Sequence, residues 1–171
     1  MIIKIIKNNK AFTLFELLIY VAILSVIVVI ISNTFISLSK GRGQSQARSE
    51  VNNAIRFSSE LLRQDIKNAS SISVPIAGGS SSSINLIRDG VTIVYDVSGG
   101  VLRRQAGAAS PSNITNNFIS VSTPTFSRIE NTNTIFSKTD ISIKVNMTFN
   151  YNSTSPDWSY STSLQTTINQ Y

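Results

Sequence analysis

Histidine and cysteine, the side chains that most often perform chemistry in proteins, are absent from this 171-residue sequence. Their absence excludes thiol nucleophiles, disulfides, zinc sites built on Cys and His, and acid–base triads built on His. No P-loop, dinucleotide-binding fingerprint or Gly-x-Ser-x-Gly elbow occurs. The acids beyond residue 60 are scattered, without metal-ligand spacing: Asp65, Asp89, Asp96, Glu130, Asp140 and Asp157. We therefore predict no enzyme, no catalytic or metal-binding residue and no cofactor.

Glu16 is the exception, because it stands in an otherwise apolar segment. Residues 12–31 read FTLFELLIYVAILSVIVVII, and fifteen of these side chains are Leu, Ile, Val or Phe. Twenty helical residues span about 30 Å, the thickness of the hydrocarbon core of a bilayer. The apolar side chains favour insertion by about 5–9 kcal/mol, whereas an acid near the end of the span costs less than about 3 kcal/mol. The segment is predicted to cross a membrane; the alternative is a very apolar buried helix.

Three lysines, Lys4, Lys7 and Lys10, precede this segment and favour an N-terminus that stays in the cytoplasm. They also account for half of the net charge of +6. Without them, twelve basic and nine acidic residues leave +3, which is too little to predict a nucleic-acid partner. An ordinary cleaved signal peptide fits poorly, because the apolar run is too long and the nearest small-x-small site, at residues 37–39, lies well beyond it.

An acid inside a membrane needs a positive partner or a route to the headgroups. No Lys or Arg lies within two helical turns after Glu16, and Lys10 is six residues upstream. A cut immediately before Phe12 would create a new α-amino group that could serve as the partner. The alternative is that the Glu16 side chain reaches the headgroups by itself.

Residues 10–24, KAFTLFELLIYVAIL, resemble the processing site of type IV prepilins. That family has a short basic leader, a small residue before the cut, a Phe as the first mature residue and an acid at the fifth mature position. Ala11 stands where Gly is usual, and it is also small. The resemblance implies that prepilin peptidase cuts after Ala11, that Phe12 is then N-methylated, and that Glu16 meets the mature N-terminus of a neighbouring subunit in a filament.

Beyond the apolar segment the pattern becomes amphipathic. Gly41 and Gly43 each weaken a helix by about 1 kcal/mol and predict a kink or a local melt. After them, apolar residues recur every three or four positions from Val51 to Ala69, with polar residues on the other face. We predict a helix over about residues 44–68 whose apolar face packs on a sheet, in preference to a coiled coil.

From residue 71 the composition shifts to Ser, Thr and Asn with β-branched residues, which is typical of strands. Residues 84–88 and 91–97, joined by Asp89-Gly90, predict a hairpin with a type I′ turn. In residues 140–150 the apolar side chains alternate and share one face. Residues 78–83 and 105–113 are predicted loops, and Pro124 breaks the strand pattern of 118–130. The predicted fold class is α+β, with a long N-terminal helix, half transmembrane and half amphipathic, packed on an antiparallel β-sheet of about seven strands.

A second resemblance lies in this β-rich part. Residues 91–104, VTIVYDVSGGVLRR, resemble a strand–turn–strand of J-type minor pseudopilins of type II secretion, which often carry Tyr … Gly-x-Leu-x-Arg. Residues 61–66, LLRQDI, and the closing residues 164–168 are similar to those proteins as well. The alternative for Arg103 and Arg104 is a solvated strand end.

These resemblances imply a pilin-like fold and a structural subunit, a minor pilin or pseudopilin, of a type IV pilus-like or type II secretion filament. The implied domains are a basic leader (1–11), a transmembrane and filament-core helix (12–38), an amphipathic helix (39–70) and a β-rich globular domain (71–171). The implied location is the cytoplasmic membrane, single-pass, with the C-terminal domain outside the cytoplasm, and then a filament. The implied partners are prepilin peptidase, membrane lipid and other subunits, with no nucleic acid.

Two other functions stay open. One is a signal-anchored extracytoplasmic binding module that never assembles, in which Glu16 is incidental. The other is a DNA-binding minor pilin, which would need a basic surface; Arg103, Arg104 and Arg128 are the residues that could cluster to form it. The aromatic residues Tyr151, Trp158 and Tyr160 could form a binding patch, although packing is the simpler prediction.

Overall fold

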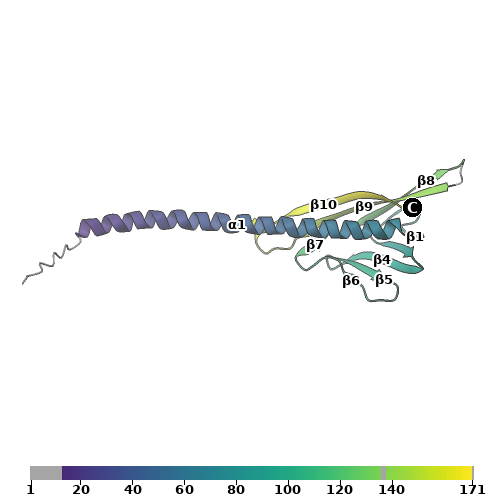
Figure 1. Cartoon of the computed structure of the whole chain (residues 1–171), viewed down its shortest axis with the longest axis horizontal. Coiled ribbons are helices and arrows are strands. Elements are labelled where there is room, and N and C mark those ends of the chain that lie inside the picture. The colour runs from purple at the N-terminus through teal and green to yellow at the C-terminus, as the bar shows by residue number, and fades with distance from the viewer. Residues whose placement is uncertain (1–12, 136–137, 171) are drawn as a thin grey trace, which may run out of the picture. The chain divides into compact units, whose positions relative to one another are not determined.

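The computed structural model describes residues 13–135 and 138–170, and a single long helix dominates it (Figure 1). This helix, α1 (Leu14–Lys67), has 54 residues. The chain forms two compact units, one ending at Gly41 and the other beginning at Arg42. The second unit contains all the strands.

The helix passes through Gly41 and Gly43 without a break, so the predicted local melt at these residues is wrong. A cost of about 1 kcal/mol for each glycine is small beside the hydrogen bonding and packing of the turns around it. Gly43 is buried, and a Cβ atom there would overlap the indole ring of Trp158. The absence of a side chain at Gly43 therefore permits the close approach of the Trp158 ring and does not end the helix.

The first sheet contains five antiparallel strands in the order β1-β3-β4-β5-β6. Their bounds are β1 (Ser71–Val74), β3 (Ile84–Arg88), β4 (Val91–Ser98), β5 (Val101–Ala106) and β6 (Ser112–Asn113). The predicted hairpin between β3 and β4 is confirmed: Asp89 has φ 52° and Gly90 has φ 77°, the positive values that a type I′ turn requires. Gly99 and Gly100 repeat this conformation between β4 and β5, with φ 59° and 77°.

The second sheet has the order β10-β9-β8-β2, with β7 also paired to β9. Its strands are β2 (Ser80–Ser81), β7 (Ile119–Val121), β8 (Thr125–Asn133), β9 (Lys138–Tyr151) and β10 (Ser161–Asn169), with a 3₁₀ helix, η1 (Pro156–Trp158), before β10. The break at Pro124 is confirmed, because β7 and β8 pair in turn along β9. The β-rich part therefore folds into two sheets, and the short strands β2 and β6 lie in segments predicted as loops, where two-residue pairings leave no periodic signal.

In the second unit one core joins α1 to both sheets. Figure 1 shows β4, β5 and β6 on one side of this part of α1, with β9 and β10 on the other. The buried core includes Val51, Leu62 and Ile66 of α1, Leu86, Tyr95 and Leu102 of the first sheet, and Phe126, Ile143, Val145, Met147 and Phe149 of the second. The shared apolar face of β9 is thereby confirmed. The α+β prediction of one long helix with antiparallel strands is confirmed as well.

Candidate functional site

The processing and assembly residues lie at the start of α1. Ala11 and Phe12 fall outside the described residues. Thr13 caps the helix: its Oγ1 accepts a hydrogen bond from the Glu16 N–H at 3.2 Å, and its carbonyl accepts one from the Leu17 N–H at 3.2 Å. Thr-x-x-Glu is the sequence of a capping box, in which both residues satisfy unpaired N–H groups of the first turn. This local pattern is readable in the sequence and would have predicted the start of the helix at Thr13.

Glu16 is a half-buried acid in the first turn of α1. A negative charge is favourable there, because the unpaired N–H groups give the start of a helix a partial positive charge. The structure therefore places Glu16 in the first turn of its own helix, where an acidic side chain is favourable. A neighbouring positive group would add to this effect and is not needed to explain the acid's position.

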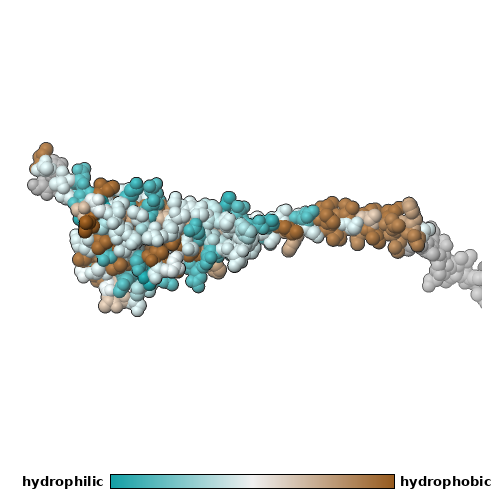
Figure 2. Space-filling model, turned by 180° about the vertical axis from the view of Figure 1, so that it is seen from behind, coloured by the Kyte–Doolittle hydropathy of each residue, from teal (hydrophilic) through white to brown (hydrophobic). Residues whose placement is uncertain are grey.

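Downstream of Glu16, α1 exposes apolar side chains on all sides. Residues such as Leu24, Ile31 and Leu38 are more than half exposed. Figure 2 shows the corresponding apolar surface on the N-terminal part of the helix. By length and composition this helix could cross a membrane. Such a surface is stable only when lipid or other apolar surface covers it.

Three hydroxyl side chains within this span donate hydrogen bonds to carbonyl groups of the same helix. Ser25 donates to the Ala22 carbonyl at 2.8 Å, Ser32 to the Val28 carbonyl at 2.8 Å, and Thr34 to the Ile30 carbonyl at 2.9 Å. A hydroxyl that is already hydrogen-bonded costs less to move out of water. The apolar character of the helix therefore extends to Leu38, beyond the twenty residues that the composition marks.

The main polar cluster of the second unit surrounds Asp65, which is fully buried near the end of α1. Its Oδ1 accepts a hydrogen bond from Nη1 of Arg88 on β3 at 2.8 Å. Its Oδ2 accepts from Nε of Arg104 on β5 at 2.7 Å and from the hydroxyl of Tyr95 on β4. Three neighbouring strands therefore converge on one carboxylate of the helix.

These contacts set the ionisation of the cluster. Burial raises the pKa of Asp65, but the hydrogen bonds from Arg104, Tyr95 and Arg88 outweigh it, so the pKa lies below its usual value. Burial, followed by the hydrogen bond to Asp65, raises the pKa of the Tyr95 hydroxyl. The hydrogen bond to Asp65 raises the pKa of Arg104. The carboxylate is therefore ionised and the tyrosine neutral at neutral pH.

The cluster contains residues of both segments that resemble J-type pseudopilins. Asp65 comes from the helical segment 61–66, and Tyr95 and Arg104 come from the strand–turn–strand segment 91–104. Tyr95 and Arg104 stand directly opposite each other in the pairing of β4 and β5. Gly100 forms the turn between them, and Leu102 is fully buried. In the sequence Asp65 is indistinguishable from the other scattered acids, because its partners lie 23 to 39 residues away.

The other arginines singled out by sequence have their own partners. Arg103 pairs with Asp96 at 2.5 Å, and Arg128 pairs with Glu130 at 2.5 Å. Arg103 and Arg104 lie on the first sheet and Arg128 on the second. Each of the three arginines that could have formed a basic cluster, Arg103, Arg104 and Arg128, is engaged by an acid instead. The alternative of a solvated strand end is wrong for Arg104.

The aromatic residues near the C-terminus pack against other parts of the second unit. Tyr151 and Tyr160 are partly buried against the core. The guanidinium of Arg48 lies 5.6 Å from the centre of the Tyr160 ring, a cation–π contact. Trp158 covers Gly43 and keeps 38% of its surface exposed. Packing accounts for most of their surface, as predicted.

Comparison with known proteins gives one match. Residues 6–32 match a family model described as the prokaryotic N-terminal methylation motif. The matched range contains Ala11, Phe12 and Glu16 and the beginning of the exposed apolar helix. No curated protein and no solved structure gives a significant match. The chain is thus prepilin-like at its N-terminus, which suggests a structural protein anchored in a membrane.

Proposed function

We propose that this chain is the precursor of a structural subunit, a minor pilin or pseudopilin, of a type IV pilus-like or type II secretion filament. The observation that carries the proposal is the methylation motif at residues 6–32, on a helix whose apolar side chains are exposed as far as Leu38. Such a helix needs lipid around it before assembly and the helices of other subunits afterwards.

In this proposal the leader of residues 1–11 stays in the cytoplasm and prepilin peptidase removes it after Ala11. Phe12 becomes the methylated mature N-terminus. Residues 12–38 then form the membrane and filament-core helix, residues 39–70 the amphipathic helix, and residues 71–171 the globular domain outside the cytoplasm. The basic residues before the span and the exposed apolar side chains within it support this arrangement.

Glu16 is proposed to set the position of each subunit in the filament. Its carboxylate meets the positive N-terminus of a neighbouring subunit among apolar helices, where the attraction between two charges is stronger than in water. A subunit out of position leaves one of these charges unpaired, which is costly in such surroundings.

Within the filament proteins, the resemblance favours a J-type minor pseudopilin. The residues that carry it are Asp65, Tyr95 and Arg104, which join α1 to the first sheet. Motif residues that contact one another in a buried cluster support the resemblance better than the same residues scattered over unrelated places in the fold.

The signal-anchored binding module is the second candidate. One observation favours it: the Thr13 cap gives Glu16 a favourable place within its own helix, so the acid requires no partner subunit.

The intact mass of the membrane-extracted protein, produced with and without prepilin peptidase, tests the proposal. We expect a peptidase-dependent species that lacks Met1–Ala11 and is one methyl group heavier than the remaining chain. A full-length chain in both preparations would contradict the proposed processing, unless Ala11 itself blocks cleavage. The Ala11→Gly variant separates these cases: if it is also uncut, the binding module replaces the filament subunit.

A further inference from the structure

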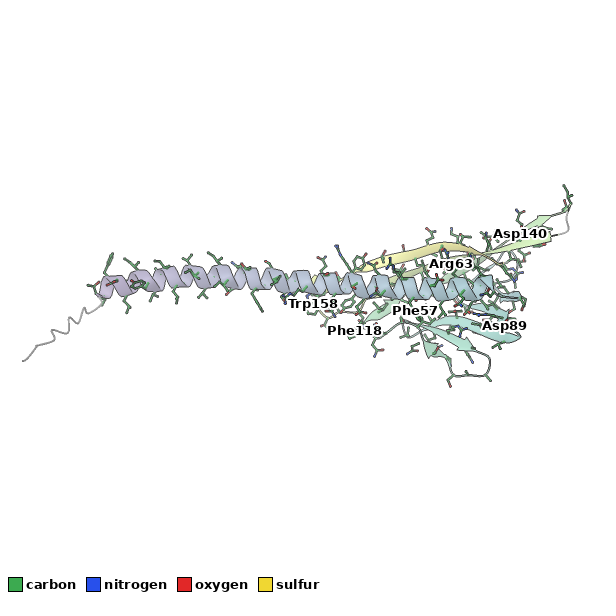
Figure 3. The ribbon with its side chains drawn as sticks, viewed as in Figure 1. Phe57, Arg63, Asp89, Phe118, Asp140 and Trp158 are labelled. Carbon is green, nitrogen blue, oxygen red and sulfur yellow. The ribbon has the colours of Figure 1, made fainter. Side chains whose placement is uncertain are left out.

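One end of the second unit combines exposed aromatic and basic side chains, at the point where α1 enters it. We call this group the interfacial patch; its members are Arg42, Arg48, Phe118 and Trp158. Both arginines are exposed, and 56% of Phe118 and 38% of Trp158 are accessible. Figure 3 shows Trp158 and Phe118 near this end of the unit.

Short-range contacts hold the patch in place. The indole of Trp158 lies against Gly43, one residue after Arg42. The Asn152 N–H donates to the Phe118 carbonyl at 2.7 Å, which joins the chain before β7 to the loop that leads to Trp158. The Ser159 hydroxyl donates to the Pro156 carbonyl at 3.1 Å and closes the 3₁₀ turn that carries Trp158. Arg48 is held over the ring of Tyr160.

We propose that the interfacial patch lies among the phospholipid headgroups on the outer surface of the membrane before the subunit is assembled. This inference rests on the membrane anchoring in the proposed function. The apolar side chains of α1 end at Leu38, and Arg42 follows four residues later in the same unbroken helix. Four helical residues rise about 6 Å. The headgroup layer on each side of a bilayer is about 5–7 Å thick.

The side chains of the patch suit this layer. Tryptophan is enriched at membrane–water interfaces, because its ring is apolar and its N–H is polar. Arginine can lay its aliphatic stem along apolar surface and bind a phosphate through its planar guanidinium. The acids Glu50 and Asp157 belong to the same segments, so the net charge of this region is small. We therefore attribute the interaction to the indole and to guanidinium–phosphate contacts, and expect it in zwitterionic bilayers.

Trp158 is the one tryptophan of the chain and so reports its own environment by fluorescence. The full-length protein is reconstituted in phosphatidylcholine vesicles that contain lipids brominated either near the carbonyl groups or near the acyl ends. We expect the shallow bromines to quench Trp158 at least twice as strongly as the deep ones. The double variant Arg42→Gln, Arg48→Gln should weaken the shallow quenching, whereas Arg63→Gln, at an exposed arginine far along α1, should not.

A second protein controls for insertion. In the double variant Leu24→Trp, Trp158→Phe the reporter lies in the middle of the span, where deep bromines should quench more strongly. If they do, while Trp158 in the parent chain is quenched by neither lipid, the inference is overturned. If neither the brominated lipids nor aqueous iodide quench Trp158, its ring is covered by protein and not by lipid, and the inference is again overturned. If the control is not quenched, the chain is not inserted, and the membrane anchoring fails together with the inference.

Discussion

Arg104 and Asp65 are 39 residues apart in the sequence, yet Nε of the first lies 2.7 Å from Oδ2 of the second. This ion pair joins β5 to the end of α1 in the interior of the second unit. Arg88 and Tyr95 donate to the same carboxylate. Of these four residues, Asp65 alone belongs to the helix, and the other three belong to strands. Asp65 is therefore the contact through which the polar groups of the first sheet hold the helix.

Replacing Asp65 with Asn should destabilise the second unit. The change leaves Arg104 without its counter-charge and Arg88 with the exposed Asp89 alone, at 3.4 Å, while both guanidinium groups are about three-quarters buried. Removing one partner of a buried ion pair costs about 3 kcal/mol or more. Urea unfolding of the full chain in detergent micelles measures the loss. Asp89→Asn is the matched control, since the Asp89 side chain is 85% exposed, and its effect should stay below about 0.5 kcal/mol.

Acid should weaken the same cluster. The pKa of Asp65 is lower in the folded chain than its ordinary value of 3.8, so the unfolded chain binds more protons in the acid range. Its contribution to stability is complete above the ordinary value and is lost as the pH falls through the lower, folded value. The free energy of unfolding should therefore decline below about pH 4. The decline should be shallower in Asp65→Asn; equal slopes would contradict the assignment.

Adjacent arginines on β5 should differ sharply in importance. Arg104 pairs with the fully buried Asp65, whereas Arg103 pairs with Asp96, whose side chain is 39% exposed. We expect Arg104→Ala to lower the free energy of unfolding by about 2 kcal/mol, because Asp65 keeps one guanidinium, and Arg103→Ala to have a much smaller effect. The two urea midpoints decide the question. If the two variants lose similar amounts of stability, the effect comes from the packing of β5 and not from the ion pair with Asp65.

Local patterns predicted the elements of the fold well. Asp89-Gly90 required positive φ values and gave the expected hairpin, and the alternation along residues 140–150 gave the buried face of β9. The division into two sheets could not be predicted in this way. It depends on pairings between distant segments, such as Ser80 with Ser127, which no local period records.

Gly43 shows, at a single residue, how a local pattern can miss a contact with a distant part of the chain. In sequence, Gly43 indicates a weak point of the helix, because it has a high conformational entropy in the unfolded chain. In the structure it is the residue that admits the Trp158 ring, 115 positions away in sequence. The same holds for the candidate site. The Thr13–Glu16 cap is a local pattern that the sequence shows, whereas the role of Asp65 depends on strand residues that are distant in the sequence.

The two glycines of α1 should respond in opposite directions to alanine. Gly41 has open space around its Cα, so Gly41→Ala should raise the free energy of unfolding by about 0.5–1 kcal/mol through helix propensity. In Gly43→Ala the new methyl group overlaps the indole of Trp158, and the ring has to move at a cost of about 1–3 kcal/mol. Urea midpoints and the Trp158 emission maximum measure both effects. A Gly43→Ala variant with parental emission would show that the ring does not pack there.

Thr13 should control the first turn of α1, from which Glu16 projects. Removal of an N-cap side chain costs about 1 kcal/mol, so Thr13→Ala should accelerate hydrogen exchange of the Glu16 amide about fivefold. Thr13→Ser keeps the hydroxyl acceptor and should exchange like the parent chain. The measurement is made by NMR on the full chain in micelles, with the Leu24 amide as an internal reference within the helix. If Thr13→Ala leaves the Glu16 amide as protected as before, the first turn is held by the apolar helix that follows it, and the cap is dispensable.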